Sequence, residues 1–436
     1  MIPATLAVDG VTPATLQPSL AIPTRARGDP KLDPDDGLAY DPGTMHERDS
    51  LVPGFASALP APAVTTTGKV VIDRHALNRA RGGMPWLAAS EVVSYEGDHG
   101  PFADAVDETG LPVGTVLWDP GSDIRARLIA TARTRDPLGL LATRLERAEH
   151  RRSHDLQDAG ACRLCHGEAD GVPGVFIDRF GDALHVDVDS PVLLPWLADL
   201  LAGTLERQGV GTIVLRHAGR TERLRGTTST ARYPAGRLQL AVDLEADDVR
   251  RLSAELDATR RLRSWVRGRT LDVFANGGAF ALHQADAGAG VSTVVDVGAA
   301  HQARVMGFAR DNGLQDRIEA IDACPMDWLK HTQQTFDLVI CHPPHEALPR
   351  EQAEQRAVAI AASALRLVGE GAIFCARSAS TSLDDERFAA ALAEVGTQLR
   401  RRLQVLARLG PGPDHPTLAG TPMAPSILVL RVMSTG

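Results

Sequence analysis

The chain has 436 residues, of which 44% are hydrophobic and 23% are charged, and its formal net charge is −9. This size and balance predict a globular protein of two or three domains, each able to bury a core of its own. The acidic charge excludes a protein that coats nucleic acid unspecifically. No apolar run approaches the ~18–20 residues that a membrane helix needs, so we expect no membrane partner.

The cysteine content and the first residues indicate where the protein works. The opening stretch MIPATLAVDGVTPATLQPSL lacks the basic region and the continuous apolar region of a signal peptide. The chain has five cysteines, and an odd number in a long chain favours a reducing compartment over a disulfide framework. Both features predict a cytoplasmic protein.

The first two segments of the chain differ in composition. Residues 1–66 are rich in Pro, Asp, Ala and Thr and have no sustained period, which predicts a disordered or irregular arm. Residues 67–135 contain short β-type runs, among them KVVIDRHAL, VGTVLWD and DIRARLIA, which Gly, Pro and Asp turns separate. This second segment predicts a small β-rich domain.

Residues 136–235 predict a linking helix followed by a small α+β domain. The stretch DPLGLLATRLERAEHRRSHDL places Leu138, Leu141 and Leu145 at helical spacing. The stretch from residue 160 to residue 190 then predicts two strands joined by a Gly- and Pro-rich turn. A helix through LLPWLADLLAGTLERQG and a strand GTIVLRH complete this domain.

One string in this segment matches a known metal motif. Cys162, Cys165 and His166 fit the C-x-x-C-H pattern of haem attachment. They fall on a predicted strand, in a chain without an export signal, and no second C-x-x-C or H-x-H pair could complete a zinc site. We interpret the string as a chance match and expect no metal in the protein.

Residues 236–436 show buried strands that alternate with helices. The runs TLDVFA, STVVDV, RIEAID, FDLVICH, GAIFCARS and SILVLRVM are short and apolar, and each of the first five is followed by a helical pattern. Such alternation predicts an α/β, doubly wound and mostly parallel sheet of the Rossmann type.

The residues that follow these strands predict a nucleoside cofactor, because ligands bind at the carboxyl ends of parallel strands. Asn276, Gly277 and Gly278 follow the first strand, and glycine allows the backbone to approach a ligand closely. Asp296 ends the second strand, where a carboxylate suits a ribose diol, and Asp322 ends the third, where it suits an adenine amino group. The loop lacks a full G-x-G-x-x-G motif, which favours S-adenosylmethionine (SAM) over NAD.

Three further stretches carry a family resemblance: SDIRARLIA (122–130), GEADGVPGVFIDRFGD (167–182) and DHP (414–416). With them, residues 69–436 resemble the PUA-containing 5-methylcytosine methyltransferases of large-subunit (23S) ribosomal RNA, a branch of the class I SAM-dependent methyltransferases. The resemblance implies an RNA-binding PUA-like barrel at 67–135, a central domain at 136–235 and a methyltransferase domain at 236–436. It also implies SAM as cofactor, RNA as partner and RNA contacts by Arg125 and Arg127.

The chain departs from this family at the positions that perform catalysis. The family's substrate loop is Asp-Pro-Pro-Lys, whereas this chain has His342, Pro343 and Pro344 followed by a second histidine. The family nucleophile is a cysteine between two serines, and the matching residue is Ala379. Methylation at cytosine C5 needs a thiolate that adds to C6, and an alanine methyl cannot do this. Cys375 and Cys341 are the substitute thiols to consider, although buried cysteines on strands are usually inert. His342 is a candidate acid or base.

Three functions therefore remain open from the sequence. The first is a SAM-dependent RNA methyltransferase with impaired or altered catalysis, which we favour. The second is a non-catalytic protein that binds RNA or the ribosome through Arg-rich faces. Residues 125–152 hold eight Arg against three acidic residues, and residues 249–269 hold seven against two. The third is an enzyme with the same fold that methylates a small molecule, because a fold does not determine its substrate.

Overall fold

A computed structural model describes seven stretches of the chain. They are residues 66–98, 100–155, 160–246, 249–344, 348–378, 383–421 and 426–435, and the side chains of residues 153–155 and 251 are not described. The predicted arm, apart from residue 66, lies outside these residues. All of the described stretches belong to one compact unit, Ser50–Gly436.

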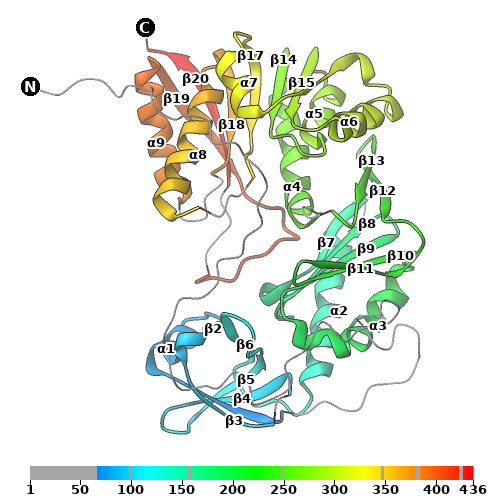
Figure 1. Cartoon of the computed structure of the whole chain (residues 1–436), viewed down its shortest axis with the longest axis vertical. Coiled ribbons are helices and arrows are strands. Elements are labelled where there is room, and N and C mark those ends of the chain that lie inside the picture. Colours follow the sequence, from blue (N-terminus) through cyan, green and yellow to red (C-terminus); the bar gives the residue numbers. More distant parts are fainter. Residues whose placement is uncertain are drawn as a thin grey trace, which may run out of the picture. The chain divides into compact units, whose positions relative to one another are not determined.

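The first domain is a six-stranded sheet with the strand order β2-β6-β5-β4-β1-β3 (Figure 1). Its strands are β1 (Gly68–Ile72), β2 (Trp86–Ala88), β3 (Val92–Gly97), β4 (Phe102–Asp107), β5 (Pro112–Trp118) and β6 (Ile124–Ala130). Helix α1 (Arg74–Arg81) follows β1 and begins at Asp73, whose Oδ1 accepts a hydrogen bond from the Ala76 amide at 2.7 Å. Alternating residues of the strands, such as Val70 and Ile72, fill the core of this domain.

The second domain begins with helix α2 (Pro137–Asp155), which confirms the predicted linking helix. A five-stranded sheet follows in the order β11-β10-β9-β8-β7. Its strands are β7 (Ala161–His166), β8 (Val175–Phe180), β9 (Ala183–Val188), β10 (Thr212–His217) and β11 (Arg220–Arg225). The predicted helix is divided into a 3₁₀ turn, η3 (Pro191–Trp196), and α3 (Leu197–Gln208). The prediction of two strands between residues 160 and 190 is wrong, because a tight turn at residues 181–182 separates β8 from β9 and makes three.

A hairpin of β12 (Thr230–Ala235) and β13 (Leu238–Asp243) leads to the third domain, a seven-stranded sheet in the order β16-β15-β14-β17-β18-β20-β19. The strands are β14 (Arg269–Val273), β15 (Val291–Asp296), β16 (Ile318–Asp322), β17 (Phe336–Cys341), β18 (Val368–Ala376), β19 (Arg401–Leu409) and β20 (Ile427–Ser434). The pairs from β16 to β18 are parallel, and β20 is antiparallel to both of its neighbours. The chain reverses its direction of progress across the sheet between β14 and β17, and this is the switch point at which ligands bind.

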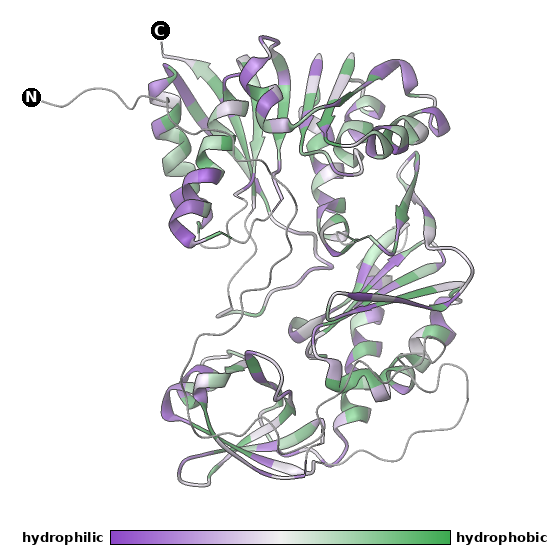
Figure 2. Cartoon of the chain, viewed as in Figure 1, coloured by the Kyte–Doolittle hydropathy of each residue, from purple (hydrophilic) through white to green (hydrophobic). Residues whose placement is uncertain are grey.

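Helices cover both faces of this sheet, as a doubly wound fold requires (Figure 1). On one face, α7 (Pro325–His331), α8 (Arg350–Leu365) and α9 (Asp385–Gln398) share an apolar core with the sheet. On the other, α4 (Val249–Leu262), α5 (Ala279–Asp286) and α6 (Ala299–Asp311) do so. Figure 2 shows the apolar residues concentrated in the central strands and along the sides of the helices that meet them. The predicted α/β fold is confirmed.

Strand β19 is absent from our sequence prediction. Its sequence RRLQVLARL has a hydrophobic pattern that also suits a helix, and only its hydrogen bonds to β20 decide in favour of a strand. Among the helices of the described residues, none has the length and the apolar character that crossing a membrane requires.

Candidate cofactor and substrate site

The loop after β14 brings three of the predicted cofactor residues to the carboxyl edge of the sheet. Asn276 has a φ of 49°, a left-handed conformation that Asn tolerates better than most residues, and Gly278 has a φ of 71°. Gly278 immediately precedes α5, so the loop presents its backbone beside the amide-rich first turn of this helix. Asp272, a buried residue of β14, accepts a hydrogen bond from the Ala281 amide at 3.3 Å and ties the strand to α5. Asp272 was not predicted from the sequence, although a carboxylate within an apolar strand is a visible signal.

Gly277 and Gly278 provide a matched test of this loop. A Cβ atom on Gly278 would lie 2.8 Å from Val305 Cγ2 in a strained backbone conformation, whereas a Cβ on Gly277 meets nothing within 4 Å. We expect Gly278→Ala to lower the free energy of unfolding by about 2–4 kcal/mol. Gly277→Ala should change it by less than about 0.5 kcal/mol. Urea unfolding of both variants checks this, and equal stability of the two variants would contradict it.

Asp296 and Asp322 tie the three loops of this edge together. Asp296 Oδ2 accepts a hydrogen bond from the Asn276 amide at 2.9 Å, and its Oδ1 accepts one from the Val297 amide at 2.8 Å. Asp322 Oδ1 accepts a hydrogen bond from the Gly298 amide at 2.7 Å. Each carboxylate oxygen has a second lone pair, so these bonds leave acceptor capacity for a ligand. The side chain of Asp296 is 20% exposed and that of Asp322 is exposed.

His301 is a second residue that sequence reasoning missed. It lies in the first turn of α6, and its Nε2 is 3.7 Å from Asp296 Oδ2. The helix pattern around His301 gave no sign of this contact, because the sequence does not show which side of the first turn of α6 faces Asp296. A histidine beside Asp296 can polarise or shield this carboxylate, for which the sequence predicts a contact with a ribose.

His342, the candidate acid or base, is buried. Its side chain is 3% exposed, and its Nδ1 lies 3.1 Å from Glu255 Oε1 on α4. The ring of Phe280 meets the His342 ring edge-on, with centroids 6.2 Å apart. A carboxylate that orients an imidazole is the arrangement of a general acid–base pair. Pro343 is buried and Pro344 is exposed, while the second histidine of the loop, His345, lies outside the described residues.

Neither of the nearby thiols has the character of a nucleophile. Cys375 is fully buried on β18, where it pairs with Ile340 and Val429, and burial raises the pKa of its thiol well above the usual range. Burial, together with the charge of Asp272, raises the pKa of the Cys341 thiol to about 12. A thiol held protonated cannot add to a pyrimidine, so this geometry does not support Cys375 as a catalyst. Ala379 lies outside the described residues.

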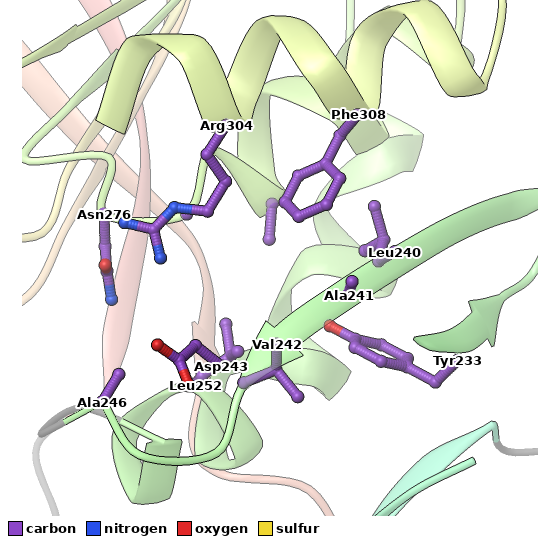
Figure 3. A pocket seen from close by; sticks show the side chains of 12 residues that line it. Tyr233, Leu240, Ala241, Val242, Asp243, Ala246, Leu252, Asn276, Arg304 and Phe308 are labelled. Atoms are coloured by element: carbon purple, nitrogen blue, oxygen red, sulfur yellow. The ribbon is translucent and has the colours of Figure 1, made fainter. Parts of the chain in front are cut away.

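A small cavity of about 30 Å³ lies beside the cofactor loop, between the hairpin β12–β13 and α6 (Figure 3). The side chains of Asp243, Asn276 and Arg304 extend toward it from three different elements. Phe308 and Tyr233 contribute rings to its walls. This volume holds about two water molecules. A cavity of this size is too small to enclose a nucleoside.

The two arginines proposed to contact RNA have different surroundings. Arg125 is partly exposed and donates a hydrogen bond to the Pro120 carbonyl oxygen. The side chain of Arg127 is only 5% exposed, and its NH1 is 3.0 Å from Glu168 Oε1 in the second domain. A buried, paired guanidinium does not reach a phosphate, so this placement supports a structural role for Arg127.

The remaining motif forms no metal centre in the part of the chain that the structure describes. Cys162 and Cys165 are buried in β7, and burial raises the pKa of both thiols. Among the described residues, no group of three or more His, Cys, Asp and Glu side chains is arranged to hold a metal ion.

The third domain has the fold of a SAM-dependent methyltransferase, with a PUA-like domain before it. Residues 70–131 match the family model of the PUA-like domain. A solved methyltransferase complexed with SAH superposes with a TM-score of 0.73 at 15% identity, over 83% of this chain and 99% of that chain. A protein from Streptococcus mutans, described as a SAM-dependent methyltransferase, gives a TM-score of 0.72 at 14% identity over the same shares.

Sequence comparison finds relatives that act on ribosomal RNA. The chain is 26% identical over 370 residues to "Ribosomal RNA large subunit methyltransferase" of Deinococcus radiodurans, which covers 77% of this chain and 90% of that protein. It is also 26% identical over 372 residues to "Ribosomal RNA large subunit methyltransferase I" of Escherichia coli, over 78% of this chain and 92% of that protein. The similarity therefore extends over nearly the full length of both relatives.

Proposed function

We propose that the protein is a SAM-dependent methyltransferase that acts on large-subunit ribosomal RNA. The observation that carries this proposal is the edge where the backbone of Asn276–Gly278, the carboxylate of Asp296 and that of Asp322 meet through hydrogen bonds. The similarity to ribosomal RNA methyltransferases across 77% of the chain supports the substrate class. A PUA-like domain ahead of the catalytic fold supports an RNA partner.

The residues at this edge fit SAM. Asp296 would accept hydrogen bonds from the ribose hydroxyls, and exposed Asp322 would accept one from the adenine amino group. The backbone of Gly277 and Gly278 leaves room for the cofactor, because no side chain projects from it. When bound, SAM supplies a methyl group on a sulfonium, an electrophile that needs no metal ion and no phosphate cradle.

The catalytic step would differ from the thiolate route of the 5-methylcytosine family. The pair His342 and Glu255 can hold or accept a proton, which suits a nitrogen or oxygen nucleophile of the RNA. Such an atom attacks the methyl group directly and needs no covalent intermediate. We therefore propose altered catalysis with His342 as the acid–base residue and Glu255 as the residue that positions it.

A second function is favoured by the burial of His342 and Cys375. A protein without a working nucleophile or base could bind RNA without modifying it. Methyl transfer separates the two functions: tritium from methyl-labelled SAM should enter protein-free large-subunit ribosomal RNA, and His342→Ala should reduce the rate by about 10²–10⁴-fold. SAM binding without any labelled RNA would support the non-catalytic function.

Cofactor binding is tested by calorimetry and by the reactivity of one cysteine. We expect SAM to bind the wild-type protein, and Asp296→Ala to weaken binding by about tenfold or more, because a charge-assisted hydrogen bond contributes about 1.5–3 kcal/mol. Cys324 lies two residues after Asp322 and is exposed, while the other four cysteines are buried. SAM should therefore slow maleimide labelling of Cys324. Labelling of the denatured protein gives the total thiol content for comparison. Absence of both heat and protection would refute the cofactor assignment.

A further inference from the structure

A larger cavity is lined by none of the residues that we assign to SAM. Its volume is about 340 Å³, within the range of small-molecule sites. Its walls come from β2 of the PUA-like domain, from β7 and β8 of the central domain, from α4, and from residues 411–421 after β19. No role in the reaction has so far been given to these residues.

Four flat rings contribute to the walls of this cavity. Trp86, His166, Phe176 and His415 all line it. The centroid of the His166 ring lies 5.4 Å from that of Phe176 and 5.2 Å from that of His415. The guanidinium carbon of Arg250 lies 3.3 Å from the Phe176 ring centroid. Aromatic rings and a stacked arginine are the surfaces on which proteins bind unstacked nucleobases.

Two of these rings offer hydrogen-bonding groups of opposite kind. His166 Nδ1 accepts a hydrogen bond from Arg163 NH1 at 2.9 Å, so the hydrogen of the neutral ring is on Nε2, which becomes a donor. His415 Nδ1 lies 3.0 Å from Asp414 Oδ1 and donates to it, which leaves Nε2 as an acceptor. That Nε2 is buried and has no hydrogen-bond partner among the described residues. Buried polar atoms nearly always have a hydrogen-bond partner. A hydrogen-bond donor from a ligand would supply the partner for this Nε2 atom.

The charges around the cavity suit a neutral ligand group better than a phosphate. Arg163 is held by Asp178 at 2.7 Å, and Arg250 is 3.1 Å from Asp189 Oδ1. Both guanidinium groups are therefore already paired. Burial, with the charge of Arg163, lowers the pKa of His166 to about 3, so its ring stays neutral near pH 7. A base, which is uncharged and planar, matches these walls.

The cavity also lies next to the catalytic edge. Ala254 of α4 lines it, and the adjacent residue, Glu255, holds His342. Strands β18 and β19 are both antiparallel to β20 and therefore run in the same direction. The segment 410–421 thus leaves the sheet at its carboxyl edge, where the cofactor loops lie, and it contributes His415 to the cavity.

We propose that this cavity binds one unstacked nucleobase of a single-stranded RNA segment. The inference rests on the proposed function for RNA as the substrate, and it adds the place where one base is held. The rings stack on the base, while His166 and His415 bond its edge with one donor and one acceptor. Every nucleobase presents both kinds of group on its Watson–Crick edge.

Filling the cavity tests this proposal. Ala169→Phe and Ala254→Phe place a ring inside it, whereas Ala419→Phe adds the same ring to an exposed position of segment 410–421 that does not line the cavity. The probe is a fluorescent single-stranded RNA of mixed sequence, about 12 nucleotides long, read by anisotropy at constant salt. We expect both filling variants to raise the Kd for the RNA probe about tenfold. Losing the stacking of one base on a protein ring weakens binding by about this factor or more. Ala419→Phe should bind like the wild type, and thermal melts verify that all variants are folded.

Two results would overturn the proposal: equal affinity of folded filling variants, control and wild type, or no binding of the probe by the wild type. Its failure differs from failure of the proposed function. If the filling variants methylate RNA and bind it as the wild type does, the proposed nucleobase site is refuted. The proposed methyltransferase function is then unaffected. If filling weakens RNA binding but the wild type binds no SAM, the cavity assignment stands and the cofactor assignment falls.

Discussion

Replacing Arg163 with methionine is expected to lower the free energy of unfolding by about 3–5 kcal/mol, because it leaves a buried carboxylate without its partner. Arg163 is 1% exposed, and its Nε and NH2 lie 2.7 and 2.8 Å from the two oxygens of Asp178, which is fully buried. Ser253 Oγ of α4 donates a further hydrogen bond to Asp178 Oδ1 at 2.5 Å. Burial alone would raise the pKa of Asp178, but Arg163 holds it below the usual range.

The measurement is urea unfolding followed by circular dichroism at pH 7. The double variant Arg163→Met with Asp178→Leu removes both charges and should recover much of the lost stability, since apolar replacement of a buried ion pair is often neutral. A double variant as unstable as the single one would show that lost packing, and not the unpaired carboxylate, causes the effect. Arg237→Met, in which an exposed arginine undergoes the same change, serves as the matched control and should leave the stability within about 0.5 kcal/mol.

The second expected result is a loss of stability between pH 6.5 and pH 4, to which two fully buried histidines contribute a defined share. His185 on β9 and His283 on α5 are 0% and 2% exposed, and burial lowers the pKa of each to about 4. In the unfolded chain these rings have a pKa near 6.5. Between these two pKa values the unfolded state binds a proton that the folded state does not. The free energy of unfolding therefore decreases as the pH is lowered. At pH 5 each histidine should cost about 2 kcal/mol relative to pH 7.

The surroundings of both rings explain why their pKa values are lowered. Both ring nitrogens of His185 and the Nδ1 of His283 are buried without a hydrogen-bond partner among the described residues. Asp178 partly offsets the burial of His185, while Arg163 reinforces it, and Arg263 reinforces that of His283. The urea midpoint at pH 7 and pH 5 measures the effect. The variant His185→Leu with His283→Leu should reduce the stability difference between pH 7 and pH 5 by about 4 kcal/mol, while His166, whose pKa burial also lowers, keeps its own contribution. An unchanged difference would assign the effect to other groups.

Much of the third domain could be predicted from the sequence because its signals are local. Short apolar strands alternate with helices, and strand ends in a parallel sheet meet at one edge, so Asp296 and Asp322 could be placed near each other in advance. The hydrogen bonds through Asn276 and Gly298 agree with that placement. Strand β19 could not be predicted, because its pattern suits both a helix and a strand and its pairing with β20 decides.

The contacts that define the substrate side depend on residues far apart in the chain. The Arg163 amide donates to Asp414 Oδ2 at 2.9 Å across a sequence separation of 251 residues. Glu255 meets His342 only because α4 packs against the face of the sheet that carries β17. No pattern within a window of the sequence encodes such pairs, since they follow from how segments far apart in the chain pack against one another.

By itself, the sequence determined the doubly wound sheet, the PUA-like resemblance and the order of the residues along the candidate cofactor edge. These follow from hydrophobic period and from strand ends, which are properties of neighbouring residues. Only the tertiary structure decided that His342 and Cys375 are buried, that Arg127 is paired with Glu168, and that His166 and His415 share a cavity. Exposure and pairing depend on which distant segments cover a side chain, and that is set when the whole chain packs.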